Sequence, residues 1–168
     1  MGGNIQVNSQ LGKGTEFIVD LPVEIAEKSE TEEQANVSTD NLKDARILLV
    51  EDNEINIYVV QLILEKAGCV VEVARDGKQA VEQFQQSADG YFKAILMDVR
   101  MPVMNGIEAT REIRALSRED AKKIPVIAMT ADAFDEERKQ TLDAGMNYHL
   151  SKPINPQILY NVLSKYMG

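Results

Sequence analysis

After Arg46 the chain alternates between two patterns of apolar and polar residues. Short apolar runs rich in residues that favour β-structure predict strands, and the longer stretches between them are typical of helices. Strands are expected at residues 47–50, 70–73, 94–97, 126–129 and 148–150. Helices are expected at about residues 54–67, 77–87, 106–117, 134–144 and 155–166.

Five strands that alternate with five helices predict an α/β fold, a doubly wound (βα)5 unit with a five-stranded parallel sheet covered on both faces. Local signals agree with several boundaries: Asp76 and Asn155 are suited to capping helix N-termini, and Gly68 and Gly145 follow helix C-termini. In such sheets ligands bind beyond the carboxyl ends of the strands. The residues that follow each strand are therefore the first candidates for a functional site.

Residues 1–22 have a different pattern. Ile5 and Val7 alternate with polar neighbours, as do Phe17 and Val19, and glycines lie between the two segments. This pattern predicts a two-stranded β-hairpin with a glycine turn. The Gly-Lys-Gly-Thr sequence in the turn lacks the spacing of a phosphate-binding loop, so we interpret it as a plain turn.

The charge of the chain is unevenly distributed. The 168 residues include 18 Lys and Arg against 27 Asp and Glu, a net charge of −9, which argues against binding to nucleic acid or to an anionic membrane surface. Residues 23–44 contain seven acidic and two basic residues and no aromatic residue, a composition that predicts a flexible acidic linker. A single cysteine, Cys69, and a single histidine, His149, exclude a disulfide framework and a Cys/His zinc site.

Charged and hydroxyl side chains follow four of the five predicted strands. Glu51 and Asp52 follow the first strand, Asp98 the third, Thr130 the fourth and Lys152 the fifth. Neighbouring carboxylates repel one another unless a cation binds, and oxygen ligands without His or Cys favour Mg²⁺. A carboxylate beside a divalent ion, a lysine and a hydroxyl group is suited to accepting a phosphoryl group.

Each of these residues also has an ordinary structural interpretation. Asp52 or Asn53 could cap the helix that follows, Thr130 could mark a helix entry, and Lys152 could be a surface residue before a proline. Taken singly, each residue favours the structural interpretation. Their joint occurrence at four strand ends favours a functional site.

Four segments resemble the response-regulator receiver domain, and the resemblance extends over about residues 45–168. It implies the flavodoxin-like strand order 2-1-3-4-5. The segments are ILLVEDN at residues 47–53, MDVRMPVMNG at 97–106, MTA at 129–131 and SKPI at 151–154.

The resemblance assigns roles to the residues at the strand ends. It implies that Asp98 is the phosphorylated aspartate and that Thr130 and Lys152 contact the phosphoryl group. Glu51 stands where many members of the family have Asp. The implied metal is Mg²⁺ or Mn²⁺, bound by Glu51, Asp52, Asp98 and the backbone carbonyl of Arg100.

The resemblance also implies a switch and a set of modulating positions. His149 occupies the position of the family's switch aromatic, which moves together with the Thr130 hydroxyl. Arg100, Ala131 and Asp132 are expected to modulate the reaction. We hypothesise that Arg100 and Asp132 form an ion pair that hinders the water that hydrolyses the phosphoaspartate.

The first 22 residues resemble the last strands of a histidine-kinase ATPase domain, without that domain's glycine boxes. The implied order is a kinase remnant (1–22), an acidic linker (23–44) and a receiver domain (45–168), as in a fragment of a hybrid sensor histidine kinase. The receiver is then expected in the cytoplasm, with its parent anchored in the inner membrane. The fragment would catalyse only its own phosphorylation and dephosphorylation. The alternative is a stand-alone single-domain response regulator.

The predicted helix at 54–67 has more apolar residues than a surface helix needs. The excess predicts either a variation in packing or an exposed patch for a helical partner. The resemblance implies two protein partners, a histidine kinase phosphohistidine as donor and a histidine phosphotransfer protein or domain. The apolar residues are Ile55, Ile57, Val59, Val60, Leu62, Ile63 and Leu64.

Two rival classes fit the sequence less well. A haloacid-dehalogenase-type phosphatase also has an Asp after a strand, but it needs a second acid at the position of Arg100. A flavodoxin needs a phosphate loop rich in Ser and Thr after the first strand, where Glu51 and Asp52 would repel the phosphate of the flavin.

Overall fold

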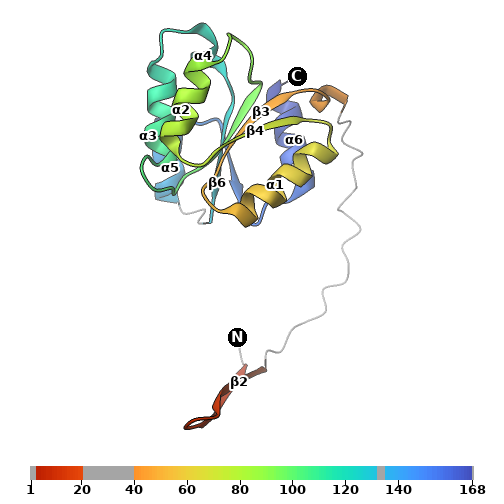
Figure 1. The fold of residues 1–168 in the computed structure, drawn as a ribbon, viewed down its shortest axis with the longest axis vertical. Helices are drawn as coiled ribbons and strands as arrows, with labels where there is room; N and C mark the ends of the chain where they lie inside the picture. The colour runs from red at the N-terminus through yellow and green to blue at the C-terminus, as the bar shows by residue number, and fades with distance from the viewer. Residues whose placement is uncertain (1–2, 21–39, 132–134, 168) are drawn as a thin grey trace. The chain divides into compact units, whose positions relative to one another are not determined.

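The computed structural model describes residues 3–20, 40–131 and 135–167. The chain forms two compact units, Met1–Ala35 and Asn36–Gly168, and each is described here by itself (Figure 1).

The smaller unit contains an antiparallel β-hairpin made of β1 (Asn4–Gln10) and β2 (Gly14–Asp20). Apolar residues lie opposite one another on one face, as in the pair Val7 and Phe17, and both side chains are exposed. The predicted hairpin is confirmed. A two-stranded sheet with an uncovered apolar face is only marginally stable by itself in water.

The larger unit is built on a five-stranded parallel sheet. Its strand order is β4-β3-β5-β6-β7, which is 2-1-3-4-5 when the strands are numbered within this unit, so the predicted fold class and strand order are confirmed. The five strands are β3 (Arg46–Val50), β4 (Val70–Ala74), β5 (Ala94–Asp98), β6 (Val126–Thr130) and β7 (Tyr148–Ser151).

Helices cover both faces of this sheet (Figure 1). Successive residues of a strand point to opposite faces, and in β3 Ile47 and Leu49 pack with α1 and α6, whereas Leu48 and Val50 pack with α2 and α3. No helix among the described residues has both the length and the hydrophobicity needed to cross a membrane. The helices are α1 (Glu54–Lys66), α2 (Gly77–Gln86), α3 (Gly106–Ala115), α4 (Glu119–Lys123), α5 (Asp135–Asp143) and α6 (Pro156–Met167).

The short helix α4 is absent from the sequence prediction. The helix expected at 106–117 ends at Ala115, and α4 follows after a break. Arg114 stabilises this arrangement, because its guanidinium donates hydrogen bonds to the carbonyls of Ala121 and Ile124 at 2.7 and 2.8 Å. Such contacts between a side chain and distant backbone have no periodicity in the sequence.

A 3-10 turn, η1 (Asp40–Leu42), precedes the first strand of the larger unit. Leu42 is fully buried, in the same apolar cluster as residues of α1 and α6. The apolar core therefore includes part of the segment whose composition predicted a linker. The rest of that segment, up to residue 39, lies outside the described residues.

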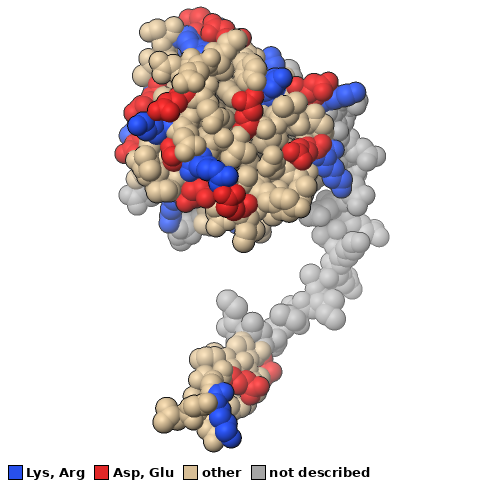
Figure 2. Space-filling model, viewed as in Figure 1, with Lys and Arg blue, Asp and Glu red and all other residues tan. Residues whose placement is uncertain are grey.

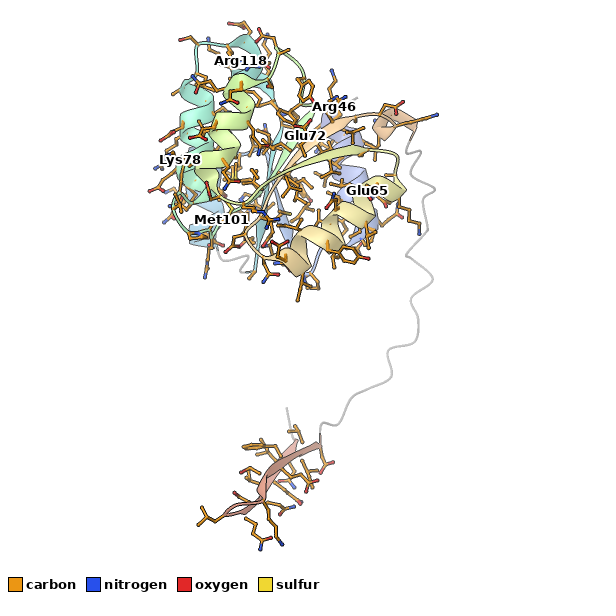
Figure 3. The ribbon with its side chains drawn as sticks, in the orientation of Figure 1. Arg46, Glu65, Glu72, Lys78, Met101 and Arg118 are labelled. Atoms are coloured by element: carbon orange, nitrogen blue, oxygen red, sulfur yellow. The ribbon has the colours of Figure 1, made fainter. Side chains whose placement is uncertain are left out.

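Polar contacts join the first residue of β3 to the middle of β4. Arg46 Nη1 donates a hydrogen bond to the Tyr91 hydroxyl at 3.0 Å, and that hydroxyl donates to Glu72 at 2.6 Å. Figure 3 shows Arg46 and Glu72 side by side on the two strands. These contacts link the two neighbouring strands through their side chains.

Acidic and basic side chains are intermixed on the face of the larger unit shown in Figure 2. This agrees with its composition, since residues 45–168 contain 18 acidic and 15 basic residues.

Candidate functional site

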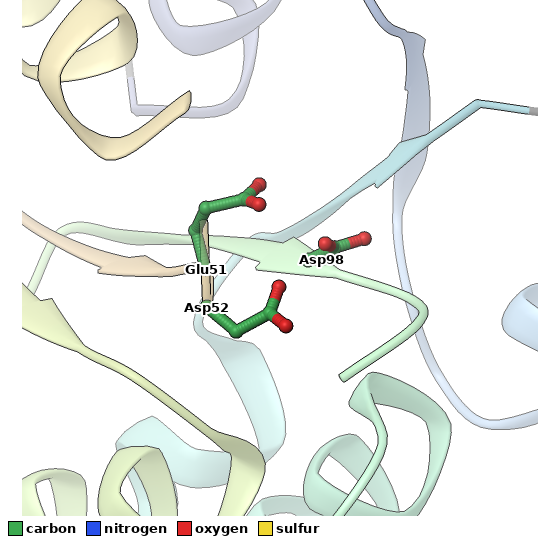
Figure 4. A group of neighbouring side chains, drawn as sticks. All are labelled: Glu51, Asp52 and Asp98. Atoms are coloured by element: carbon green, nitrogen blue, oxygen red, sulfur yellow. The ribbon is translucent and has the colours of Figure 1, made fainter. Parts of the chain in front are cut away.

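Three carboxylates lie together beyond the carboxyl ends of β3 and β5 (Figure 4). Glu51 and Asp52 directly follow β3, and Asp98 ends β5, the neighbouring strand. One carboxylate oxygen of each residue lies within 4.8 Å of those of the other two. Glu51 and Asp98 are buried, at 1% and 6% exposed, whereas Asp52 is exposed. A cluster of carboxylate oxygens alone fits a hard cation such as Mg²⁺.

Asn53, not Asp52, caps the N-terminus of α1. Asn53 Oδ1 accepts hydrogen bonds from the backbone N–H groups of Ile55 and Asn56, at 2.9 and 3.2 Å. Because Asn53 already satisfies these N–H groups, the Asp52 carboxylate is not needed as the cap.

Both oxygens of the buried Glu51 carboxylate are held in place. Oε1 accepts a hydrogen bond from Asn56 Nδ2 at 2.9 Å, and Oε2 accepts one from Lys152 Nζ at 2.6 Å. The first contact comes from α1 and the second from the end of β7, so Glu51 connects two elements across the site.

Lys152 bridges the two buried carboxylates. Its ammonium group donates to Asp98 Oδ2 at 2.7 Å as well as to Glu51. Burial alone would lower the pKa of Lys152, but the hydrogen bonds to Asp98 and Glu51 outweigh burial and raise it. The pKa of Asp98 is raised mainly by burial and also by the negative charge of Glu51, against the lowering effect of Lys152. A further positive charge at this site would therefore stabilise the ionised form of Asp98.

Thr130 and Arg100 both donate hydrogen bonds to Glu137 of α5. Thr130 is the buried last residue of β6, and its hydroxyl donates a hydrogen bond to Glu137 Oε2. Arg100 Nε donates to Glu137 Oε1 at 3.1 Å. Ala131, which follows Thr130, is exposed. Asp132, the expected partner of Arg100, lies outside the described residues.

His149 lies half-buried in β7, and its Nε2 contacts the hydroxyl of Thr141 on α5. The pKa of His149 is lowered by burial and by the positive charge of Arg138, against the opposite effect of Glu137. Thr130 and His149 line one cavity of about 220 Å³. The other lining residues are Arg138, Leu142, Asn147, Tyr148 and Ser151.

The loop after β5 is held against the strand by two glycines. A Cβ on Gly106 would lie 2.1 Å from the carbonyl oxygen of Asp98, and one on Gly77 would lie 2.6 Å from that of Met104. Asn105 caps α3 through a capping box with Glu108. These close approaches fix the backbone that carries Asp98.

Sequence reasoning missed three residues that contact the predicted site residues: Asn56, Glu137 and Thr141. Asn56 could have been found, because it lies in the first turn of the helix that follows Glu51. Glu137 and Thr141 reach Thr130 and His149 from α5, and no spacing in the sequence indicates which side chains of that helix face the strand ends.

The sequence pattern of the response regulator receiver domain matches residues 47–164, and this chain belongs to that family. Longer relatives are sensor kinases. The chain is 39% identical over 163 residues to the autoinducer 2 sensor kinase/phosphatase LuxQ of Vibrio vulnificus, covering 96% of this chain and 18% of that protein. It is 35% identical over 168 residues to the aerobic respiration control sensor protein ArcB of Escherichia coli, covering 99% of this chain and 21% of that protein. The chain therefore spans about a fifth of these relatives.

Solved structures support the same assignment. The receiver domain of the sensor histidine kinase PA1611 from Pseudomonas aeruginosa is 42% identical, with a TM-score of 0.67, over 74% of this chain and 98% of that one. That structure has a magnesium ion coordinated in its active site cleft. The receiver domain of Ssk1 from Saccharomyces cerevisiae, solved with the histidine phosphotransfer protein Ypd1, is 27% identical, with a TM-score of 0.64, over 74% of this chain and 89% of that one.

Proposed function

We propose that Asp98 accepts a phosphoryl group from a phosphohistidine, in a reaction that requires Mg²⁺ or Mn²⁺. The observation that carries this proposal is the arrangement of Asp98 between Lys152, at 2.7 Å, and the carboxylates of Glu51 and Asp52. One carboxylate oxygen of Asp98 forms a bond to phosphorus as the bond from phosphorus to the histidine nitrogen breaks, and the ring leaves as neutral imidazole that keeps the proton on its other nitrogen.

The residues around Asp98 have distinct parts in this reaction. Lys152 compensates the negative charge of the transferred group, and the Thr130 hydroxyl donates a hydrogen bond to it. A divalent cation supplies further neutralisation of the phosphoryl oxygens and the acidic cluster. The residues that would hold it are Glu51, Asp52, Asp98 and Arg100, the last through its backbone carbonyl.

The transfer partner is a histidine phosphotransfer protein or domain that docks on α1. The magnitude of the exposed apolar surface supports this: Ile55, Tyr58 and Leu62 are 73%, 64% and 48% exposed. Beside this surface a cavity of about 130 Å³ is lined by Glu51 and Lys152 and by apolar residues of α1. A partner seated there would bring its histidine next to Asp98. The complex of Ypd1 with a similar receiver domain agrees with this kind of partner.

The chain is the receiver of a hybrid sensor histidine kinase that works in the cytoplasm, with the hairpin as the end of the kinase ATPase domain and residues 23–44 as a linker. The support is that the match to LuxQ covers 96% of this chain, so it extends beyond the receiver into the hairpin and linker segment. Arg100, Ala131 and Asp132 modulate the lifetime of the phosphoaspartate in this scheme, and His149 follows Thr130 as the switch residue.

The test is phosphorylation of the purified chain by acetyl phosphate with and without Mg²⁺, followed by intact mass. The wild-type chain is expected to gain one phosphoryl group in a Mg²⁺-dependent way, and Asp98→Asn is expected to gain none. Asp143→Asn, an exposed aspartate of α5, is the control and is expected to react like the wild type. Undiminished labelling of Asp98→Asn would refute the assignment.

A further inference from the structure

Glu137 binds two residues of the site through separate carboxylate oxygens. Its Oε2 accepts the hydrogen bond of the Thr130 hydroxyl, and its Oε1 accepts that of Arg100 Nε at 3.1 Å. The Glu137 side chain is 16% exposed, whereas that of Arg100 is 64% exposed. One carboxylate thus links α5 to the end of β6 and to the loop after β5.

One turn further along α5, Thr141 contacts the other predicted switch residue. Thr141 is fully buried, and its hydroxyl lies 3.1 and 2.9 Å from the backbone carbonyls of Glu137 and Arg138. The same hydroxyl contacts His149 Nε2. Residues four apart share a helix face, so one face of α5 holds both Thr130 and His149.

We propose that Glu137 is a positioning residue that holds the Thr130 hydroxyl in a resting arrangement and thereby opposes phosphorylation of Asp98. The inference rests on the proposed function of Asp98 and Thr130. A hydroxyl group has one hydrogen to donate, so Thr130 cannot donate fully to Glu137 and to a phosphoryl oxygen at the same time. Glu137 and the incoming phosphoryl group compete for that hydrogen.

The charge of the phosphoryl group favours release of this contact. Phosphorylation replaces the single charge of the Asp98 carboxylate with about two negative charges on the phosphoryl group. The net gain of about one negative charge repels the Glu137 carboxylate, and the phosphoryl oxygens attract the Thr130 hydroxyl. Glu137 then keeps the exposed Arg100 as a partner, and α5 loses its hydrogen bond to the end of β6. Phosphorylation of Asp98 thereby removes the hydrogen bond between Thr130 and Glu137 that connects α5 to β6.

The test measures the initial rate of Mg²⁺-dependent labelling of Asp98 by acetyl phosphate in single and double variants. Glu137→Gln keeps the shape of the side chain but offers a neutral, weaker acceptor, so the rate is expected to rise about fivefold. The acceleration is expected to disappear in a Thr130→Ala background, because no hydroxyl remains to compete for. Asp143→Asn removes an equal charge from an exposed position of the same helix and is expected to leave the rate unchanged.

Each outcome decides between distinct conclusions. Wild-type labelling that is absent or independent of Asp98 contradicts the proposed function itself. Normal wild-type labelling with an unchanged rate in Glu137→Gln overturns the role of Glu137 alone. An acceleration that persists with Thr130→Ala, or that Asp143→Asn reproduces, also overturns it, since both point to charge or general loosening. If Glu137→Gln does not fold, as judged by circular dichroism, Glu137→Ala is measured in the same way.

Discussion

Lys152 and Asp98 form an ion pair of 2.7 Å at the carboxyl end of the sheet, and the same ammonium group also binds Glu51. One ammonium group therefore contacts both buried carboxylates of the cluster.

Replacement of this lysine is expected to destabilise the protein. Lys152→Ala leaves two buried carboxylates without a cation, which costs about 3 kcal/mol in free energy of unfolding at neutral pH. Added Mg²⁺ is expected to restore part of the loss, because binding to the folded state stabilises it. Urea denaturation with and without Mg²⁺ measures both effects. Lys122→Ala, at an exposed ion pair of α4, is the control, with a change below about 0.5 kcal/mol. Equal losses in the two variants would contradict this account.

Gly106→Ala is expected to disturb the backbone that carries Asp98. The new Cβ would lie 2.1 Å from the Asp98 carbonyl oxygen, so the loop must move, at about 3 kcal/mol or more. Gly90→Ala provides a matched comparison, because a Cβ there meets no atom within 4 Å and only the positive φ of 70° is unfavourable. Its expected cost is about 1 kcal/mol. Thermal denaturation of both variants tests the difference, and a similar cost for the two would count against a steric cause.

The titration of His149 can be followed directly, because it is the single histidine of the chain. Its imidazole resonances in NMR are expected to titrate below 6.5, because burial and Arg138 lower its pKa. Arg138→Gln is expected to raise this pKa and Glu137→Gln to lower it, in line with the sign of each charge. A midpoint at or above 6.5 would show that the ring is not held in its neutral form.

The same shift gives stability a defined pH dependence. The unfolded chain binds the histidine proton more tightly than the folded chain, so the free energy of unfolding falls as the pH decreases below about 6.5. The fall continues until the pH passes the pKa of the folded state. His149→Phe is expected to lack this component, and the difference between the two urea-denaturation series against pH isolates it from the carboxylates.

Val103 has a left-handed backbone conformation that is unusual for a β-branched residue. Its φ is 69°, in the loop after β5, and its side chain is 82% exposed. Asn tolerates this conformation better, so Val103→Asn is expected to raise the free energy of unfolding by about 1 kcal/mol. Val103→Ala keeps the Cβ and is expected to change stability little. If the two variants have the same stability in urea, the backbone at this position is not strained.

The convergence of Glu51, Asp98 and Lys152 could be predicted because it depends on topology alone. Parallel strands end at the same edge of the sheet, so residues that follow neighbouring strands meet there whatever the details of packing. The assignment of the α1 cap to Asn53 rather than Asp52 could not be predicted, because both side chains are capable of capping and only the backbone at the start of the helix decides between them.

The contacts of α5 and the helix α4 depend on how particular side chains reach across the fold. Glu137 accepts the hydrogen bond of the Thr130 hydroxyl, and Arg114 of α3 binds the backbone carbonyls of Ala121 and Ile124 in and after α4. Leu42 lies in an acidic segment whose overall composition predicts a linker, but one buried leucine is enough to extend the core. Individual long-range contacts of this kind leave no regular spacing in a sequence.

Helix α5 has a single large apolar side chain, Leu142, which is 48% exposed, and a threonine where a core residue would be expected. A helix anchored by interlocking apolar side chains cannot shift without opening a void, at a cost of several kcal/mol. A helix held by a few hydrogen bonds exchanges one polar partner for another and leaves the packing of the sheet intact. The central strand β5, with all its residues buried, would then stay fixed while it carries Asp98, the proposed phosphoacceptor. The free energy of the proposed phosphorylation would then not be used to deform the core. It would remain available to rearrange the surface around α5, where another protein could bind.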